Sequence, residues 1–487
     1  MVQHKARDLG WIKLTHVCRH WRQVALAHLS LWTTITNDLG AKWVPLMLVR
    51  AQSLPVNIQW NPLAETLGKA SPVEVDFAPH LSHIRTLQIS DTIDRLSQII
   101  HTLLQPAPML ERITILDTAL GSSILHVPAD LFASNAPRLR TARFIGLIVS
   151  LDIPILQHIT TLDIRLRSPS PERLPSTDQF FNSLSKLHCL ECLRIEHYLP
   201  RCPDGISVRS QTRHPPIMLP QLSKIMLEGP LRSCAVAISS IYVPPTVSIG
   251  LIPHAEGPAD DLRAFIPVLE TVSGKLGGVE PIRMLQVTDN RDNGVFSVFA
   301  WRFVCDIPDD KPLSNFPKRP TISINYRAPN EDRPDALNKL YPVYRSLCLP
   351  VVWMLGLTFY QDVKTDWFEP PLLSCPNLQR IFMWGPRLKT HLCDALGPVS
   401  NSGSQGDAKV GVHFPNLRSI HLSSVEIDNM THERSQFRKR FKSVLEMRRE
   451  LSVPLKRLDL KNCSASTRHL NQLNQLVPEV FCSDDGL

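Results

Sequence analysis

One apolar pattern returns eleven times between residues 84 and 460, and it constrains the fold more than any other feature of the chain. Each copy has an apolar residue, two variable residues, a second apolar residue, one variable residue and a third apolar residue. Most copies start 20 to 39 residues after the previous one, and two gaps of 60 and 70 residues fit doubled repeats. The copies are IRTLQI (Ile84), LERITI (Leu110), LRTARF (Leu139), ITTLDI (Ile159), LECLRI (Leu190), LSKIML (Leu222), IRMLQV (Ile282), VWMLGL (Val352), LQRIFM (Leu378), LRSIHL (Leu417) and LKRLDL (Leu455).

The pattern predicts a short β-strand in each copy, because side chains alternate along a strand and the last two apolar positions then share one side. Repeats of this length are typical of solenoids, in which each unit buries its apolar side against its neighbours. We therefore expect an α/β fold with about ten to thirteen parallel strands on a concave face and with helices or turns on the convex side. The segments VSI at Val247 and ISI at Ile322 would add strands, and residues 433–451 form the clearest convex helix.

Four polar stretches interrupt the repeats and predict surface loops, at residues 165–178, 201–216, 308–320 and 397–411. The first contains Ser168 and Ser170, which precede prolines as phosphorylation sites often do. An unmodified loop is the simpler interpretation, because Ser-Pro is common in loops.

The N-terminal segment has a different pattern, with three of the nine tryptophans between residues 11 and 35. Apolar residues follow helical spacing there, at Leu14, Val17, Cys18, Trp21, Val24 and Ala25. The spacing predicts an amphipathic helix followed by a short turn near Leu31 and Trp32. Because large aromatic side chains are rarely left in water, we expect Val17, Trp21, Leu31 and Trp32 to form the packed centre of this module.

The run LTHVCRHWR over residues 14–22, followed by SLW over residues 30–32, resembles the second half of the F-box-like domain common in large fungal protein families. Residues 43–58 are similar to the segment that follows that domain. The resemblance implies a partial F-box-like helical module over residues 1–60 that docks on the small adaptor subunit of a cullin-RING (SCF-type) ubiquitin ligase. The implied adaptor-binding or module-core residues are Leu14, Val17, Cys18, Trp21, Leu31 and Trp32.

The family's opening helix, an LPPE-type apolar run, has no counterpart in the sequence MVQHKARDLG that precedes Trp11. That helix supplies much of the adaptor-binding surface in the family. We therefore expect either a chain that is truncated at its N-terminus or a module that has lost half of its docking surface.

Several repeats begin with a proline-containing lead, APRL, LPQL, CPNL or FPNL, which resembles the irregular leucine-rich repeats of F-box proteins. The resemblance implies an irregular leucine-rich-repeat domain over residues 61–487 whose concave face holds a protein target. The chain would then be a substrate-recognition subunit of the ligase and not an enzyme. The alternative is a leucine-rich-repeat scaffold that binds a protein with no ligase attached.

The outward positions of the repeats carry more basic than acidic residues, and this predicts an acidic or phosphorylated target. The basic positions are Arg112, Arg143, Arg194, Lys224, Arg380 and Arg457, and the acidic ones are Asp163 and Asp459. The other interpretation is a solvated polar face whose ligand binds to a loop.

No nucleic-acid or membrane partner is predicted. Stacking aromatics along the concave face would indicate RNA binding, and only Phe144, Trp353 and Phe382 come near that arrangement. The basic run 438–440 is more typical of a solvated helix. The uncharged run 233–253 contains two adjacent prolines that break a spanning helix. Without a signal-peptide pattern, the eleven cysteines indicate reduced thiols and a cytoplasmic or nuclear protein.

The sequence supports no enzyme class, cofactor or metal site. The run HCLECLRIEH over residues 188–197 offers two cysteines and two histidines, as zinc sites do. Cys192 immediately precedes a strand residue and Cys189 lies three residues before it, so the two thiols need not converge. The segment HERSQ at His432 lacks the second histidine of a zinc-protease helix, GSQG at Gly403 lacks the nucleophile-elbow pattern, and SGKLGG at Ser273 lacks parts of a phosphate loop.

Overall fold

The computed structural model describes residues 10–40, 42–61, 76–119, 125–167, 173–202, 208–213, 215–257, 261–290, 294–303, 317, 319–328, 336–347, 349–358, 375–385, 389–399, 411–424, 432–463 and 465–483. The fold is α/β, with a large, mostly parallel main sheet of seventeen strands in this described part of the chain. The chain divides into two compact units. Unit 1 contains residues 1–229 and 240–242, and unit 2 contains residues 230–239 and 243–487.

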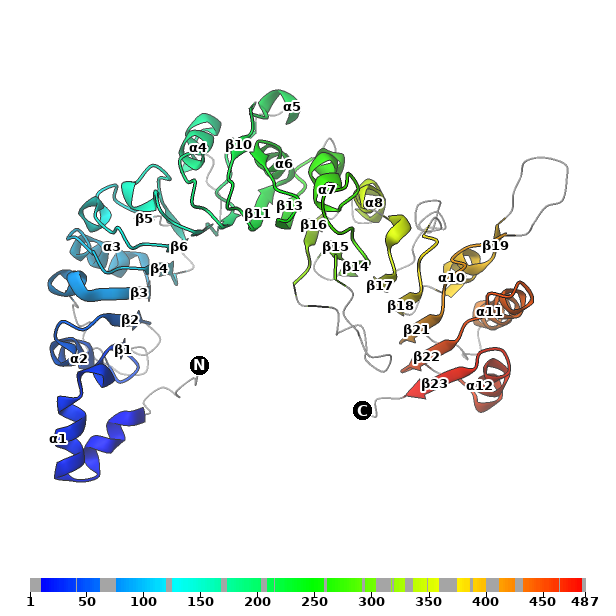
Figure 1. The fold of residues 1–487 in the computed structure, drawn as a ribbon, viewed down its shortest axis with the longest axis horizontal. Helices are drawn as coiled ribbons and strands as arrows, with labels where there is room; N and C mark the ends of the chain where they lie inside the picture. Colours follow the sequence, from blue (N-terminus) through cyan, green and yellow to red (C-terminus); the bar gives the residue numbers. More distant parts are fainter. Residues whose placement is uncertain are drawn as a thin grey trace. The chain divides into compact units, whose positions relative to one another are not determined.

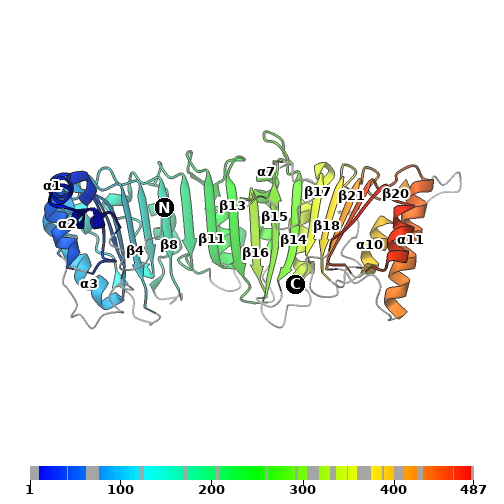
Figure 2. The same cartoon turned by 90° about the horizontal axis from the view of Figure 1, so that it is seen from below.

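Eight strands of the main sheet lie in unit 1, and each pairs in parallel with the next one along the chain (Figure 2). They are β1 (Thr34–Thr36), β2 (Val56–Trp60), β3 (Ile84–Asp91), β4 (Arg112–Asp117), β6 (Thr141–Ile145), β8 (Thr161–Arg165), β9 (Cys192–Glu196) and β11 (Lys224–Pro230). Two short parallel pairs lie beside them, β5 (Leu125–His126) with β7 (Leu147–Ile148) and β10 (Ile217–Met218) with β12 (Ile241–Tyr242). β2 pairs with β3, so the sheet of unit 1 continues past residue 60.

The connections of unit 1 are short helices and turns along one face of the sheet (Figure 1). The α-helices are α1 (Arg19–Ala27), α2 (Trp43–Ala51), α3 (Ile93–Thr102), α4 (Thr177–Leu184) and α5 (Val208–Gln211). The 3-10 helices are η1 (Gly10–His16), η2 (Leu29–Trp32), η4 (Ala78–His83), η5 (Leu131–Ser134) and η6 (Pro154–Leu156). Parallel strands require such crossovers, and these elements also cover the apolar side of the strands.

All eleven copies of the apolar pattern contain a strand in the structure, and ten of those strands begin at the third residue of the copy. The last two apolar residues of each copy point to the helix side, as alternation along a strand requires. In β4 and β8, for example, Ile113, Ile115, Leu162 and Ile164 are all fully buried. The predicted strands are therefore confirmed, and so are the two additional ones at Val247 and Ile322.

Nine strands of the main sheet lie in unit 2: β13 (Ser248–His254), β14 (Met284–Asn290), β15 (Val295–Trp301), β16 (Ile322–Arg327), β17 (Met354–Thr358), β18 (Arg380–Trp384), β21 (Ser419–Ser423), β22 (Arg457–Lys461) and β23 (Glu479–Ser483). Their spatial order is β13, β16, β15, β14, β17, β18, β21, β22, β23. The expectation of parallel pairing throughout is wrong for β15, which is antiparallel to both β14 and β16. Only four residues of sequence separate the end of β14 from the start of β15, too few for the crossover that a parallel pair needs.

The helices of unit 2 also cover one face of its strands (Figure 1). They are α6 (Leu231–Ser239), η8 (Leu262–Phe265), α7 (Ile266–Val272), α8 (Ala336–Ser346), η12 (Leu349–Val351), α10 (Lys389–Leu396), α11 (His432–Glu450) and α12 (Thr467–Asn474). The helix predicted over residues 433–451 corresponds to α11. Its inner side buries Phe437, Phe441 and Leu445, while the basic run 438–440 is exposed.

The four predicted loops are partly structured. Arg165 ends β8, and a capping box between Ser176 and Gln179 begins α4. The short helix α5 lies inside 201–216, and a two-residue pair of β19 (Pro398–Val399) and β20 (Gly411–Val412) closes the ends of 397–411. Ser168, Ser170 and most of 308–320 lie outside the described residues. None of the helices in the described ranges combines the length and apolar composition that crossing a membrane requires.

One buried cation ties α11 to the strand side of unit 2. The side chain of Arg448 is fully buried, and it donates hydrogen bonds to the carbonyl oxygens of His413 and Phe414 at 2.9 and 2.8 Å. Burial lowers the pKa of this guanidinium to about 10. The contact gives donors to two carbonyls of the β20–β21 connection, of which that of Phe414 also accepts from the backbone N–H of Leu417.

We expect Arg448→Met to lower the free energy of unfolding by about 2 to 4 kcal/mol, because two hydrogen bonds of a fully buried side chain are lost; the Phe414 carbonyl keeps the backbone N–H of Leu417 as a donor. Arg449 is the control, since it is exposed and donates to the carbonyl of Gln475 at 3.0 Å. Arg449→Met should cost less than about 1 kcal/mol. Urea denaturation of the two variants measures the difference, and equal losses would contradict the bridging role of Arg448.

Candidate functional site

The N-terminal segment folds into three short helices, η1, α1 and η2, which are held together by hydrogen bonds. The side chain of Cys18 accepts a hydrogen bond from the backbone N–H of Trp21 at 3.5 Å and caps the start of α1. Arg22 Nε donates to the carbonyl of Thr15 at 2.8 Å, which fixes α1 against η1. The sequence resemblance therefore falls on a small folded segment.

Trp32 is the centre of this segment. Its side chain is fully buried, and its Nε1 donates to the carbonyl of Ala25 at 3.0 Å. The ring of Trp11 meets it edge-on at 4.6 Å between centroids, and the guanidinium of Arg50 lies 4.2 Å from its centroid. The prediction that Trp32 is a core residue is confirmed.

The apolar stripe of the same segment faces water. Leu14 is 39% exposed, Val17 63%, Trp21 50% and Val24 51%. The prediction that Val17 and Trp21 are core residues is therefore wrong; Ala25 is the one residue of the predicted apolar stripe that is buried, and its carbonyl accepts the Trp32 hydrogen bond. Cys18 is exposed and Leu31 half-buried. We call Leu14, Val17, Trp21 and Val24 the N-terminal stripe; exposed apolar groups at regular spacing are typical of protein-binding surfaces.

The second candidate surface is the open face of unit 1, the side of its strands opposite the helices. The register aligns outward residues of neighbouring strands into rows, so that Arg143, Asp163 and Arg194 stand side by side on β6, β8 and β9. Arg165 and Glu196 form the next row two residues later. Adjacent strands are about 4.8 Å apart, so these charges act on one another directly.

Asp163 is the hub of this charge network. Arg165 donates to both of its carboxylate oxygens, from Nε at 2.8 Å and from Nη2 at 2.7 Å, and these bonds raise the pKa of Arg165. Arg143 and Arg194 lie 4.0 and 3.9 Å from the same carboxylate. Arg194 also donates to Glu196 at 2.7 Å, and Arg165 lies 3.7 Å from Glu196.

The acidic and basic side chains of this network lie at different depths below the surface. The side chains of Asp163 and Glu196 are 7% and 14% exposed, whereas those of Arg143, Arg194 and Arg165 are 51%, 35% and 30% exposed. The carboxylates lie underneath and the guanidinium groups reach the solvent. Glu228, on β11, faces His197 at 3.6 Å and adds a further negative charge to the same unit.

The structure does not gather the six predicted basic residues into one stripe. It brings Arg143 and Arg194 together around Asp163, and it leaves Arg112 and Lys224 exposed at the first positions of β4 and β11. Arg165 and Glu196 were missed as members of the site. The signal for them was present, because each lies two residues after a predicted position and therefore on the same side of its strand.

Arg380 and Arg457 lie in unit 2 and are held by aromatic rings. Arg380 covers the ring of Trp353 at 4.9 Å, and Arg457 covers Phe481 at 4.3 Å. Arg457 also donates to both oxygens of Asp459, at 3.0 and 2.9 Å. Both cations therefore already have counterparts within the unit.

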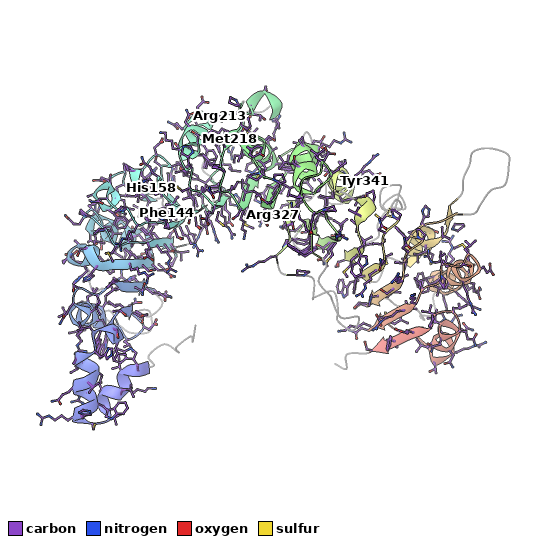
Figure 3. The ribbon with its side chains drawn as sticks, in the orientation of Figure 1. Phe144, His158, Arg213, Met218, Arg327 and Tyr341 are labelled. Atoms are coloured by element: carbon purple, nitrogen blue, oxygen red, sulfur yellow. The ribbon has the colours of Figure 1, made fainter. Side chains whose placement is uncertain are left out.

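Asp459 connects this pair to a stacked ring. Its carboxylate lies 2.5 Å from Nδ1 of His421, whose ring stacks on Phe382 at 4.2 Å. Burial alone would raise the pKa of Asp459, but the hydrogen bonds from His421 and Arg457 together lower it. Arg380 thus covers one face of the Trp353 ring, Phe382 is buried and stacks on His421, and Phe144 is fully buried on the helix side of unit 1 (Figure 3).

The cysteine and histidine run 188–197 does not converge in the structure. Cys189 is exposed, and Cys192 lies half-buried on the open face of β9, where burial raises the pKa of its thiol. No group of three or more potential metal ligands within the described ranges includes either thiol.

Comparison with known proteins places the chain in no group: no protein-family model and no curated protein matches it. The function must therefore be argued from the two surfaces themselves, the N-terminal stripe and the open faces of the strands.

Two tryptophans eleven residues apart should respond in opposite ways to truncation. Trp32→Ala removes a fully buried ring and its hydrogen bond, and we expect it to cost about 3 to 5 kcal/mol of unfolding free energy. Trp21→Ala removes a half-exposed ring and should cost less than about 1 kcal/mol. Chemical denaturation of both variants measures this. A large loss for Trp21→Ala would show that the stripe packs within the protein.

Proposed function

We propose that this protein is a substrate-recognition subunit of a cullin-RING ubiquitin ligase. The observation that carries the proposal is the N-terminal stripe. Its residues Leu14, Val17 and Trp21 belong to the run that resembles an F-box-like domain, and they are exposed while Trp32 of the same resemblance is buried. Of the six family-like residues only Trp32 is fully buried, and the exposed Leu14, Val17 and Trp21 would be available to a partner.

The chemistry of the stripe suits a protein partner with an apolar groove. Burying exposed apolar surface contributes about 25 cal/mol per Å², and aromatic anchors such as Trp21 commonly dominate an interface. The basic residues Arg19 and Arg22 flank the stripe and are exposed. An adaptor subunit would cover the apolar side chains and leave these charges at a solvated rim.

The finer fold proposed for the rest of the chain is an irregular leucine-rich-repeat solenoid, with the open faces as its concave surface. Support comes from the one strand per apolar copy and from the pairing of each unit 1 strand with its sequence neighbour. A repeat that cannot bury its apolar side alone must stack in this way.

In this proposal the chain performs no chemistry. It would hold a protein target near a ubiquitin-loaded enzyme, and the rate gain would come from proximity of a target lysine to that enzyme. The compartment would be the cytosol or the nucleus, where cullin-RING ligases assemble and where free thiols stay reduced.

We further propose that the target presents an acidic or phosphorylated segment to the open face of unit 1. Arg112 and Lys224 are exposed there, and Arg143 is half-exposed above its buried carboxylate. The segment would cross the strands between Arg112 and Lys224. Because Asp163 and Glu196 already offset two of the arginines, specificity would depend chiefly on these less-paired cations.

The alternative is a scaffold that binds a protein through the same open face and has no ligase attached. Such a scaffold would use the open face to bind its protein, as the ligase subunit would, but it would not use the N-terminal stripe. Binding to an adaptor therefore separates the two functions.

The adaptor proposal predicts that Val17→Asp combined with Trp21→Asp reduces co-purification with the ligase adaptor subunit by about tenfold or more, because a charge would enter a desolvated contact. The control is Leu46→Asp with Val49→Asp, which changes two exposed apolar residues of α2 outside the stripe. Equal effects of the two pairs, or no adaptor binding by the native chain, would contradict the ligase role and favour the scaffold.

The target proposal predicts that acidic and phosphorylated peptides bind better than neutral ones and that their binding weakens as salt increases. Arg112→Gln with Lys224→Gln should weaken this binding by about tenfold. Arg138→Gln with Lys186→Gln removes the same charge from exposed sites outside the strands. Peptide-array binding measures both pairs, and indifference to the first pair would remove the open face from target recognition.

A further inference from the structure

A pocket of about 360 Å³ lies on the helix side of unit 2, away from the open face. It is bounded by the end of η8, by α7 and the turn that follows it, and by α8; Figure 3 labels Tyr341 on this side. The residues that line it are Arg263, Ile266, Glu270, Lys275, Tyr341, Pro342, Arg345 and Ser346. Its volume is in the range of small-molecule sites.

The charges around the pocket are unequal. Three cations, Arg263, Lys275 and Arg345, face a single acid, Glu270. Glu270 is committed to Lys275, with 2.5 Å between the carboxylate and the ammonium. Among the residues that the structure describes, the acid nearest to Arg263 is Asp261, in a loose, exposed contact of 4.0 Å outside the pocket. The two guanidinium groups therefore give the pocket a net positive field.

The wall between these cations is apolar and preformed. Ile266 and Pro342 are half-buried, and the ring of Tyr341 packs edge-on against Tyr344 at 5.3 Å. Tyr344 is fully buried, so it holds the Tyr341 ring in place. The hydroxyl of Ser346 donates to the carbonyl of Val343 at 2.6 Å, which leaves its oxygen free to accept and not to donate. Recognition of a negative group would then come from the cations and the Tyr341 hydroxyl.

We propose that this pocket binds a small phosphomonoester with an apolar or aromatic body. The phosphate would sit between Arg263 and Arg345, because planar guanidinium forks match phosphate oxygens in paired hydrogen bonds. The body would lie against Ile266, Tyr341 and Pro342. Nothing in this proposal depends on the adaptor or on the target face, so either proposal can fail alone.

The test is isothermal titration of the full-length chain with phenyl phosphate as the probe, beside benzoate, inorganic phosphate and benzyl alcohol. We expect saturable binding of phenyl phosphate and weaker binding of the other three compounds. Benzoate lacks the phosphate, inorganic phosphate lacks the apolar body, and benzyl alcohol lacks the charge. Benzoate binding within about threefold of phenyl phosphate would overturn the choice of phosphate. No saturable binding of phenyl phosphate would overturn the site.

Two variants with opposite expected signs locate the binding. Arg345→Gln should weaken phenyl phosphate binding by about tenfold. Glu270→Gln should strengthen it by about threefold, since it removes the one acid and releases Lys275. Arg449→Gln, an exposed change on α11, is the control and should leave binding unchanged. Equal weakening by Arg345→Gln and Arg449→Gln, or weakening by Glu270→Gln, would overturn the proposal.

Discussion

The parallel ladder is the constraint on which the structure depends. Each strand can satisfy its backbone only beside a neighbour, and consecutive parallel strands must be joined by a crossover over one face. In unit 1 the crossovers bury the inward residues of every strand, such as Ile113 and Leu162, and leave the outward residues to solvent. One face is thereby fixed by packing, and the other is free to carry chemistry.

The same ladder determines the electrostatics of the free face. Residues in register lie about 4.8 Å from their partners on the next strand, so a charge on one strand interacts directly with the charges beside it. Asp163 lies between Arg143 and Arg194 because β8 lies between β6 and β9. In unit 2 the register likewise sets His421 beside Phe382 and Asp459, and the three side chains stack or bond across three strands. Because arginine side chains are longer than the carboxylate side chains, the guanidinium donors reach the solvent while the carboxylates stay buried beneath them.

Much of this order could be read from the sequence, because the apolar pattern reports burial directly. All eleven copies became strands, and the helix α11 appeared where its apolar spacing placed it. The antiparallel strand β15 could not be found that way, since VFSVFAW is apolar at nearly every position and has no alternation to read. The charged positions were identified by residue, but their pairing depends on which strands are adjacent. Adjacency is a tertiary property, and it places Arg143 and Arg194 on either side of Asp163, whereas the closest contact of Asp163 is with Arg165 of its own strand.

The N-terminal segment shows the limit of periodicity most clearly. Helical spacing identifies a stripe but does not say whether the chain or a partner covers it. Here the decision rests on Trp32, whose ring fills the space beneath Ala25 and is closed from the sides by Trp11 and Arg50. Once that site is filled, Trp21 and Val17 have no packing partner among the described residues close enough to bury them, and they remain in water. A surface helix with this composition gains stability only when something apolar meets it. The proposed partner would supply that apolar contact, with Trp21 as its anchor.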